Sequence, residues 1–135
     1  MYSQSEVNQL AFEVVGAAIE VHKIVGPAAL ESIYERCLLY ELSLRHISAV
    51  NQIEVPIIYK GMKLGNALKL DILVEDSIIL ELKTVKMLLP VHEVQLISYM
   101  QHTQKPKGLL INFKTAKLVD GVKPFVNKYF SALPK

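Results

Sequence analysis

Several common features are missing from this sequence of 135 residues, and each absence narrows the classes of protein to consider. Cys37 is the only cysteine, which excludes a disulfide within the chain and fits a reducing compartment. No apolar run approaches the ~20 residues that cross a bilayer, and the start, MYSQSEVNQ, lacks the charged and apolar regions of a secretory signal. We therefore expect a cytoplasmic protein with no membrane segment.

Internal repeats, low-complexity tracts and linker-like stretches are also missing. A chain of this length with 51% hydrophobic residues can bury one good core, but it is too short for two ordinary domains. We expect one domain that spans residues 1–135.

Acidic residues are scarce in residues 105–135, which carry seven lysines against Asp120 alone. The formal net charge of the whole chain is only +2. A basic segment of this kind fits the phosphate backbone of a nucleic acid, and it fits an ordinary solvated surface equally well. Charge alone leaves both interpretations open.

Helical patterns occupy the first third of the chain. Ser3 and Glu6 have the spacing of a capping box, and apolar residues then follow at helical spacing as far as Val21. Gly26 is suited to end this helix and Pro27 to begin the next, which we expect to run to about Arg45.

Alternating apolar and polar residues then indicate strands. Pro56 places the strand at residues 53–60 on the edge of a sheet. The other expected elements are strands at 64–74 and 77–83, a helix at about 91–103, a strand at 107–113, a short strand near 117–119 and a helical turn near 124–132. The predicted fold class is α/β, with a mixed sheet of about four strands flanked by helices in the order α-β-β-β-α-β.

Charged residues interrupt two of these apolar strands, in the stretch LKLDILVEDSIILELK. Such groups are costly to bury unless they are paired or bind an ion. If residues 75–77 form a three-residue loop, Asp71 lies directly opposite Glu81, with Cβ atoms about 4.5 to 5.5 Å apart. A two-residue loop would put the two carboxylates on opposite faces. Glu81 and Lys83 share a face in either case.

Two facing carboxylates cannot both stay ionised in a dry site without a compensating positive charge. Lys83 supplies one charge, and a divalent cation would supply two. Oxygen ligands favour Mg²⁺ or Mn²⁺ over zinc. A salt-bridge cluster on a solvated sheet face is the structural alternative for Asp71, Glu81 and Lys83.

The arrangement of an Asp followed about ten residues later by Glu-x-Lys, behind an N-terminal helix, resembles the PD-(D/E)xK nuclease superfamily. Within it, the chain looks like the GxxExxY proteins of the RecB-like group. The segments that carry this resemblance are VHKIVGPAALESIYE (21–35), YKGMKLG (59–65), LDILVEDSIILELK (70–83), VHEVQLISYM (91–100) and GLLINF (108–113). Two positions depart from the pattern: Ala28 stands where the named glycine is expected, and Leu70 where an alanine is expected.

The resemblance implies roles for individual residues. Asp71 and Glu81 would be metal ligands, and Glu31 on the second helix would support the metal or its waters. Lys83 would orient or help deprotonate the attacking water. Without the resemblance, Glu31 is an ordinary acid in the first turn of a helix.

Gln95 and Tyr99 are four residues apart and share a helix face, which resembles the QxxxY motif of RecB-like nucleases. The resemblance places Gln95 near the active site and Tyr99 nearby, where it contacts DNA or packs. His92 precedes this pair on the same expected helix, where it would reach a phosphate of the substrate or face water. Each of these residues also has a purely structural interpretation. His22 is either a further metal ligand or a packed core histidine, and the sequence does not decide between them.

These patterns predict a Mg²⁺- or Mn²⁺-dependent nuclease that hydrolyses phosphodiester bonds of nucleic acid, with DNA as the expected substrate. One alternative is a non-catalytic module for binding nucleic acid or protein on a nuclease scaffold. Another is a metal-dependent hydrolase of small phosphorylated molecules. Because a domain of this size has little surface with which to grip a duplex, a protein partner or a homo-oligomer also stays open.

Overall fold

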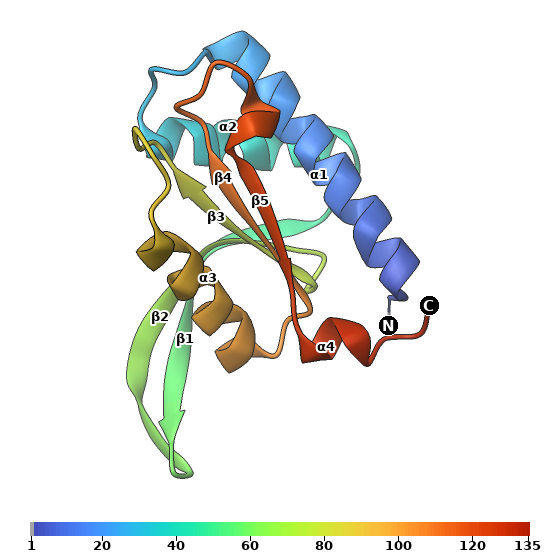
Figure 1. Ribbon diagram of the computed structural model, residues 1–135, viewed down its shortest axis with the longest axis vertical. Coiled ribbons are helices and arrows are strands. Elements are labelled where there is room, and N and C mark those ends of the chain that lie inside the picture. The colour runs from blue at the N-terminus through green and yellow to red at the C-terminus, as the bar shows by residue number, and fades with distance from the viewer. Residues whose placement is uncertain (1) are drawn as a thin grey trace.

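The computed structural model describes residues 2–135, except for the side chains of residues 66 and 67. The elements, in chain order, are α1 (Gln4–Val25), α2 (Glu31–Leu44), β1 (Ala49–Tyr59), β2 (Met62–Val74), β3 (Ile78–Lys83), α3 (Pro90–Thr103), β4 (Lys107–Asn112), the 3₁₀ helix η1 (Leu118–Gly121), β5 (Val122–Val126) and α4 (Lys128–Ser131). The predicted α/β class is confirmed, because a mixed sheet is flanked by helices (Figure 1).

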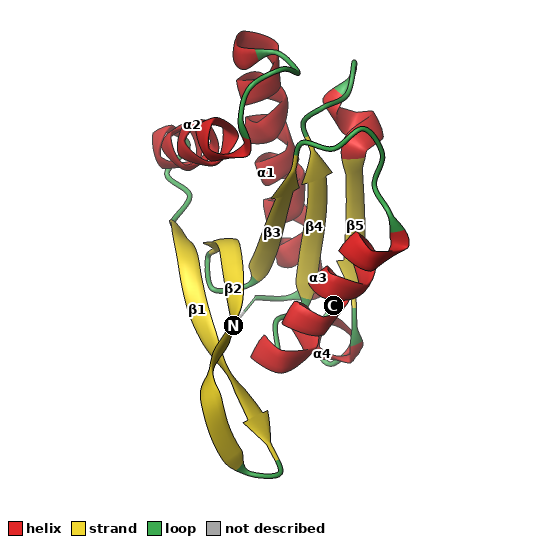
Figure 2. Ribbon diagram, turned by 90° about the vertical axis from the view of Figure 1, so that its left-hand side faces the viewer, coloured by secondary structure: helices red, strands yellow, loops and turns green. Residues whose placement is uncertain are grey.

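The sheet has five strands in the order β1-β2-β3-β4-β5. Neighbouring strands are antiparallel except for β3 and β4, which are parallel. Parallel neighbours need a crossover connection, and α3 provides it. Figure 2 shows the strands side by side, with α1 behind them and α3 in front. The prediction that the Pro56 strand lies at an edge is confirmed for β1.

Two apolar clusters hold the helices on opposite faces of the sheet. Alternate residues of β3 supply them: Ile78 and Leu80 pack with α1 and α2, whereas Ile79 packs with Leu96 and Met100 of α3. Where α3 crosses β4 the approach is close, because a Cβ added at Gly108 would lie 2.6 Å from the sulfur of Met100. The carboxyl-terminal end of β3 therefore lies between α1 and α2 on one face of the sheet and α3 on the other face.

The start of α1 is as predicted. The Ser3 hydroxyl accepts a hydrogen bond from the Glu6 backbone N–H (3.1 Å), and the Glu6 carboxylate accepts one from the Ser3 N–H (3.0 Å). Gly26, with φ of 83°, follows the last residue of this helix. The expectation for Pro27 is wrong, because α2 begins only at Glu31 and residues 27–30 form its approach.

The end of the chain also differs from prediction. Residues 118–121 form the 3₁₀ helix η1 in place of a short strand, and the next strand, β5, comes at Val122–Val126. The predicted helical turn is confined to α4. Proline at position 124 is accommodated because β5 is the other edge strand of the sheet. In the described part of the chain, no helix has the length and apolar character needed to span a membrane.

Candidate metal and catalytic centre

The turn between β2 and β3 fixes which face the charged residues share. Val74 pairs with Ile78, and Ile72 pairs with Leu80. Residues 75–77 therefore form the three-residue loop, and the two-residue alternative is excluded. In this register Asp71 lies across from Glu81, as predicted for that loop.

The strands are joined at this point through the two carboxylates. The backbone N–H of Leu82 donates to Oδ2 of Asp71 (2.9 Å). The backbone N–H of Asp71 donates to Oε1 of Glu81 in a longer contact (3.4 Å). Each carboxylate is thus held by the backbone of the opposite strand, which fixes the two groups next to each other.

Burial makes it unfavourable for both carboxylates of this pair to be ionised at the same time. Glu81 is only 4% exposed, and this burial, followed by the charge of Asp71, raises the pKa of Glu81 to about 8. Burial also raises the pKa of Asp71, while the N–H of Leu82 acts in the opposite direction. At neutral pH the pair therefore retains a proton unless a cation enters.

Lys83 supplies a positive charge beside these acids. It is half-buried at the end of β3, in register with Asn112 of β4, and its carbonyl accepts from the N–H of Phe113 (2.9 Å). Its charge lowers the pKa values of Asp71, Glu81 and Glu31. Lys83 therefore lies within electrostatic reach of all three acids.

Glu31 joins the centre from α2, of which it is the first residue. It is half-buried, and its pKa is raised by that burial and then by the charge of Asp71. As predicted, α2 thus brings an acid, Glu31, near the carboxylates of the two strands.

Tyr34 holds the approach to α2 in place. Its hydroxyl donates a hydrogen bond to the carbonyl of Gly26 and accepts one from the N–H of Ala29 (3.1 Å). Its ring is fully buried and stacks on Phe113, with ring centroids 4.3 Å apart. Because Phe113 follows β4, this contact ties the start of α2 to the sheet and so positions Glu31.

A second acid on α2, Glu35, also belongs to this region, although it was not among the predicted site residues. The carboxylate of Glu35 accepts hydrogen bonds from the side-chain amides of Gln52 (2.7 Å) and Asn51 (3.0 Å) in β1. Its charge raises the pKa values of Asp71 and Glu31. Gln52 has a left-handed backbone with φ of 51°. The available signal was spacing, because Glu31 and Glu35 share one helix face.

Tyr99 approaches the carboxylates from α3. Its pKa is raised by burial and then by the charges of Glu81 and Asp71, and a side-chain hydrogen bond with Gln95 acts in the opposite direction. The predicted pair of Gln95 and Tyr99 is therefore connected, and Tyr99 lies within electrostatic reach of the two carboxylates. His92 instead caps the start of α3, because its Nδ1 accepts from the N–H of Leu89 (3.0 Å).

His22 and Asn112 stabilise the segments around the centre through hydrogen bonds to the backbone. Nε2 of the buried His22 lies 2.9 Å from the carbonyl of Thr115, which ties α1 to the segment after β4 and matches the packing interpretation. The buried amide of Asn112 accepts from the N–H groups of Val85 and Lys114 and donates to the carbonyl of Val85. The segment that follows Lys83 is thereby fixed to β4.

The oxygen donors of this centre suit a hard divalent cation. Because burial and the charge of Asp71 raise the pKa of Glu81, a bound cation would stabilise the ionised form of this acid. Among residues 2–135, however, no three His, Cys, Asp or Glu side chains are arranged as a group that could hold a metal ion. Joint ligation by Asp71, Glu81 and Glu31 would therefore require at least one of them to change its side-chain conformation.

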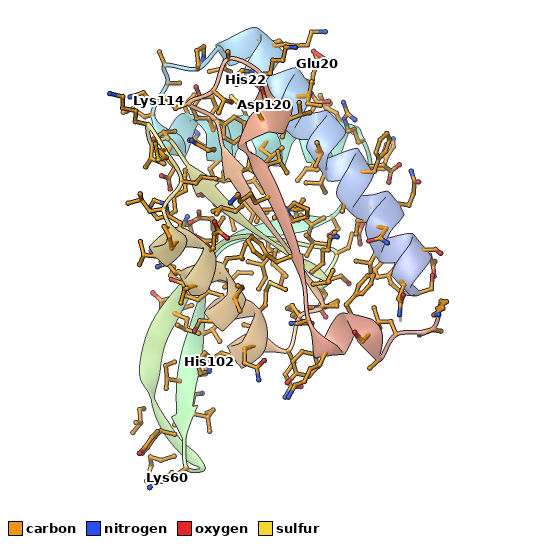
Figure 3. All side chains as sticks on the ribbon, viewed as in Figure 1. Glu20, His22, Lys60, His102, Lys114 and Asp120 are labelled. Carbon is orange, nitrogen blue, oxygen red and sulfur yellow. The ribbon has the colours of Figure 1, made fainter. Side chains whose placement is uncertain are left out.

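The lysines of residues 105–135 are distributed over different parts of the molecule. Lys105 pairs with Asp76 (2.8 Å), and Lys123 pairs with Glu93 (2.8 Å). Lys107 begins β4 and lies over the ring of Phe130, whereas Lys114 follows the opposite end of that strand, in the upper part of the view in Figure 3. Although these lysines are close in sequence, they therefore lie in different parts of the structure.

Comparison with known proteins agrees with this arrangement. A model of the PD-(D/E)XK nuclease superfamily matches residues 8–125. Comparisons with curated proteins and with solved structures gave no match. Nucleases of this superfamily generally use divalent metal ions and act on nucleic acid. The family match covers most of the chain, including α2, the two strands with the paired carboxylates, and α3, and we conclude that the chain belongs to the PD-(D/E)XK nuclease superfamily.

Proposed function

We propose that the protein is a nuclease that hydrolyses phosphodiester bonds of DNA with the help of Mg²⁺ or Mn²⁺. The observation that carries this proposal is the pair of Asp71 and Glu81, held side by side by the backbones of two strands, with Lys83 next to them. A buried pair of acids next to a lysine is costly to maintain for stability alone. Its location at the end of β3, within reach of α2 and α3, suits a site that binds a cation and a phosphate.

In this proposal Asp71 and Glu81 hold the ion, with the Leu82 carbonyl as a further oxygen donor and Glu31 in support. When bound, the ion would supply Lewis-acid polarisation of the phosphate and lower the pKa of water. Lys83 orients the attacking water and offsets negative charge in the transition state. The water oxygen bonds to phosphorus and the bond to the leaving oxygen breaks, which gives one phosphate end and one hydroxyl end.

Residues of α3 are proposed to bind the substrate. Tyr99 lies within electrostatic reach of the carboxylates and its side chain is hydrogen-bonded to Gln95, so the pair is suited to position a phosphate or the attacking water. His92 is proposed to contact the nucleic acid through its Nε2–H, since its Nδ1 accepts from the backbone of Leu89.

We further propose that the chain belongs to the GxxExxY group. Glu31 and Tyr34 have the spacing of the second half of that motif, and both take part in the centre or its support. Ala28, in place of the glycine, is exposed, and the positive φ in this segment belongs to Gly26. The alanine therefore fits its position without strain.

A non-catalytic binding module is the second candidate. It is favoured by one observation, namely that the described side chains do not form a ready-made group of three metal-ligating residues. Such a module would bind nucleic acid or protein without cleaving it.

Cleavage assays with matched variants separate these two functions. Purified protein is incubated with single- and double-stranded DNA in Mg²⁺ or Mn²⁺, next to Glu81→Ala and Lys83→Ala. The controls are Asp76→Ala and Lys128→Ala, which remove the same charges from exposed positions outside the centre. We expect cleavage by the wild type and both controls, and a loss of at least 100-fold in the two centre variants, as for other transition-state contacts.

Cleavage that persists equally in Glu81→Ala and Lys83→Ala would remove the assignment of this centre. Binding of DNA by the wild type without any cleavage, in either metal, would favour the non-catalytic module.

A further inference from the structure

A two-stranded arm projects from the body of the protein next to the proposed active centre. We define the arm as residues 53–70, in which β1 and β2 pair from Ile53 and Leu70 outward to Tyr59 and Met62. Within the described part of the chain, β2 pairs with β3 only at residues 72–74. The outer part of β2 thus has β1 as its only partner strand, and the arm extends well beyond the helices in both views (Figures 1 and 2).

The tip of the arm is a well-defined turn. Tyr59 pairs with Met62, and the two residues between them, Lys60 and Gly61, have φ values of 49° and 80°. Two central residues with positive φ are typical of a type I′ turn, which matches the twist of the two strands. The arm therefore has a defined shape as far as its end.

The surface of this arm is unusually apolar for a projecting element. Tyr59 is 58% exposed and Met62 is 62% exposed, and Ile58 and Leu64 are exposed to a similar degree. An isolated two-stranded hairpin is only marginally stable in water. An exposed arm with apolar side chains at its tip is therefore expected to gain stability from a binding partner.

The charge of the arm indicates which partner. Residues 53–70 contain three lysines, at positions 60, 63 and 69, and one acid, Glu54. Lys60 stands at the far end of the arm, with Nζ 5.5 Å from the centroid of the Tyr59 ring (Figure 3). Two copies of this arm would bring like charges together, whereas a polyanion would meet cations near the tip and near the root.

The root of the arm is the proposed active centre itself, because Leu70 directly precedes Asp71. Strand residues advance by about 3.3 Å each, so Lys63 lies about 25 Å along the strand from Asp71. A strand of B-DNA spans that distance in about seven or eight nucleotides. A nucleic acid bound at Asp71 and Glu81 that follows the arm would therefore meet Lys63 after about seven or eight nucleotides.

We propose that this arm binds the nucleic acid on one side of the cleaved bond. Lys60 and Lys63 contact phosphates near the tip of the arm and Lys69 contacts one near its root, and the ring of Tyr59 packs against a base or sugar at the far end. This inference rests on the proposed function, because it identifies a second part of the surface that the same substrate contacts.

The test measures DNA binding separately from cleavage. Binding of a fluorescent 30-base-pair duplex is followed by anisotropy in EDTA at several salt concentrations, for the wild type and for Lys60→Ala/Lys63→Ala. The control is Lys128→Ala/Lys135→Ala, which removes the same charge from exposed positions at the other end of the chain. Thermal unfolding followed by circular dichroism checks that each variant folds like the wild type.

We expect the arm variant to bind several-fold more weakly at 0.1 M salt, and its salt slope to decrease by about 1.8, or about 0.9 for each lost phosphate contact. The control should retain the wild-type slope. If the arm variant keeps the wild-type affinity and slope while the wild type binds and cleaves DNA, this inference is overturned and the proposed function is not.

If the wild type neither binds nor cleaves DNA, the proposed function fails and the role of the arm fails with it. Self-association is checked by light scattering on the wild type and on Tyr59→Ser/Met62→Ser. A wild-type dimer that becomes a monomer in this variant, with unchanged DNA affinity, would overturn the inference and assign the arm to contact between two copies.

Discussion

The hydroxyl of Tyr34 donates a hydrogen bond to the backbone carbonyl of Gly26, eight residues earlier. This bond closes the segment between α1 and α2 directly before Glu31. The two residues therefore have different roles: Tyr34 stabilises the core, and Glu31 belongs to the proposed centre.

Tyr34→Phe tests this division of tasks. The variant keeps the stack on Phe113 but leaves the carbonyl of Gly26 and the N–H of Ala29 without this partner. We expect the free energy of unfolding to fall by about 1 to 3 kcal/mol. DNA cleavage well below the unfolding temperature should fall as well, because Glu31 loses its support. Full activity in a destabilised variant would show that the hydroxyl serves stability alone.

The raised pKa of Glu81 predicts how stability depends on pH when no divalent ion is present. Between the ordinary pKa of about 4.5 and the folded value of about 8, the folded state holds a proton that the unfolded state has released. The free energy of unfolding should therefore fall as the pH rises through this range. Glu81→Gln should flatten this dependence, as measured by urea unfolding from pH 5 to 9 in EDTA.

Asp76→Asn is the control for that experiment, because Asp76 lies on the surface next to Lys105. An equally steep fall in Glu81→Gln and in the wild type would assign the pH dependence to other groups.

Asn112 is predicted to hold the segment that follows Lys83. Removal of its amide in Asn112→Ala leaves three backbone groups of Val85 and Lys114 without this partner, inside a buried region. We expect a loss of about 2 kcal/mol or more in the free energy of unfolding, measured by urea titration. Asn8→Ala, at an exposed position on α1, should change stability by less than about 0.5 kcal/mol.

Patterns with a strict local cause were predictable from the sequence. The capping box at Ser3 and the Pro56 edge strand follow from residue types at fixed spacing. For the loop before Ile78 the sequence left two lengths open, and the facing of Asp71 and Glu81 was predicted only for a loop of three residues. The register of β2 and β3 shows that this is the loop that forms.

Features that depend on distant contacts were not predictable. The start of β1 was missed because Asn51 and Gln52, which turn their amides to Glu35, interrupt the apolar alternation. The strand β5 was misplaced because none of its five residues is buried, so that it lacks an alternating apolar pattern, and because it includes a proline. The spacing of Glu35 puts it on the helix face of Glu31, but only the folded chain brings Asn51 and Gln52 of β1 against it.

Metal binding tests the central claim most directly. Mn²⁺ is titrated into the wild type, Asp71→Asn, Glu81→Gln and the surface control Asp76→Asn, and the heat of binding is measured by calorimetry at pH 8. The account predicts saturable binding to the wild type and the control, weakened at least tenfold in each of the other two. Absence of binding to the wild type, or equal binding by all four proteins, would contradict it.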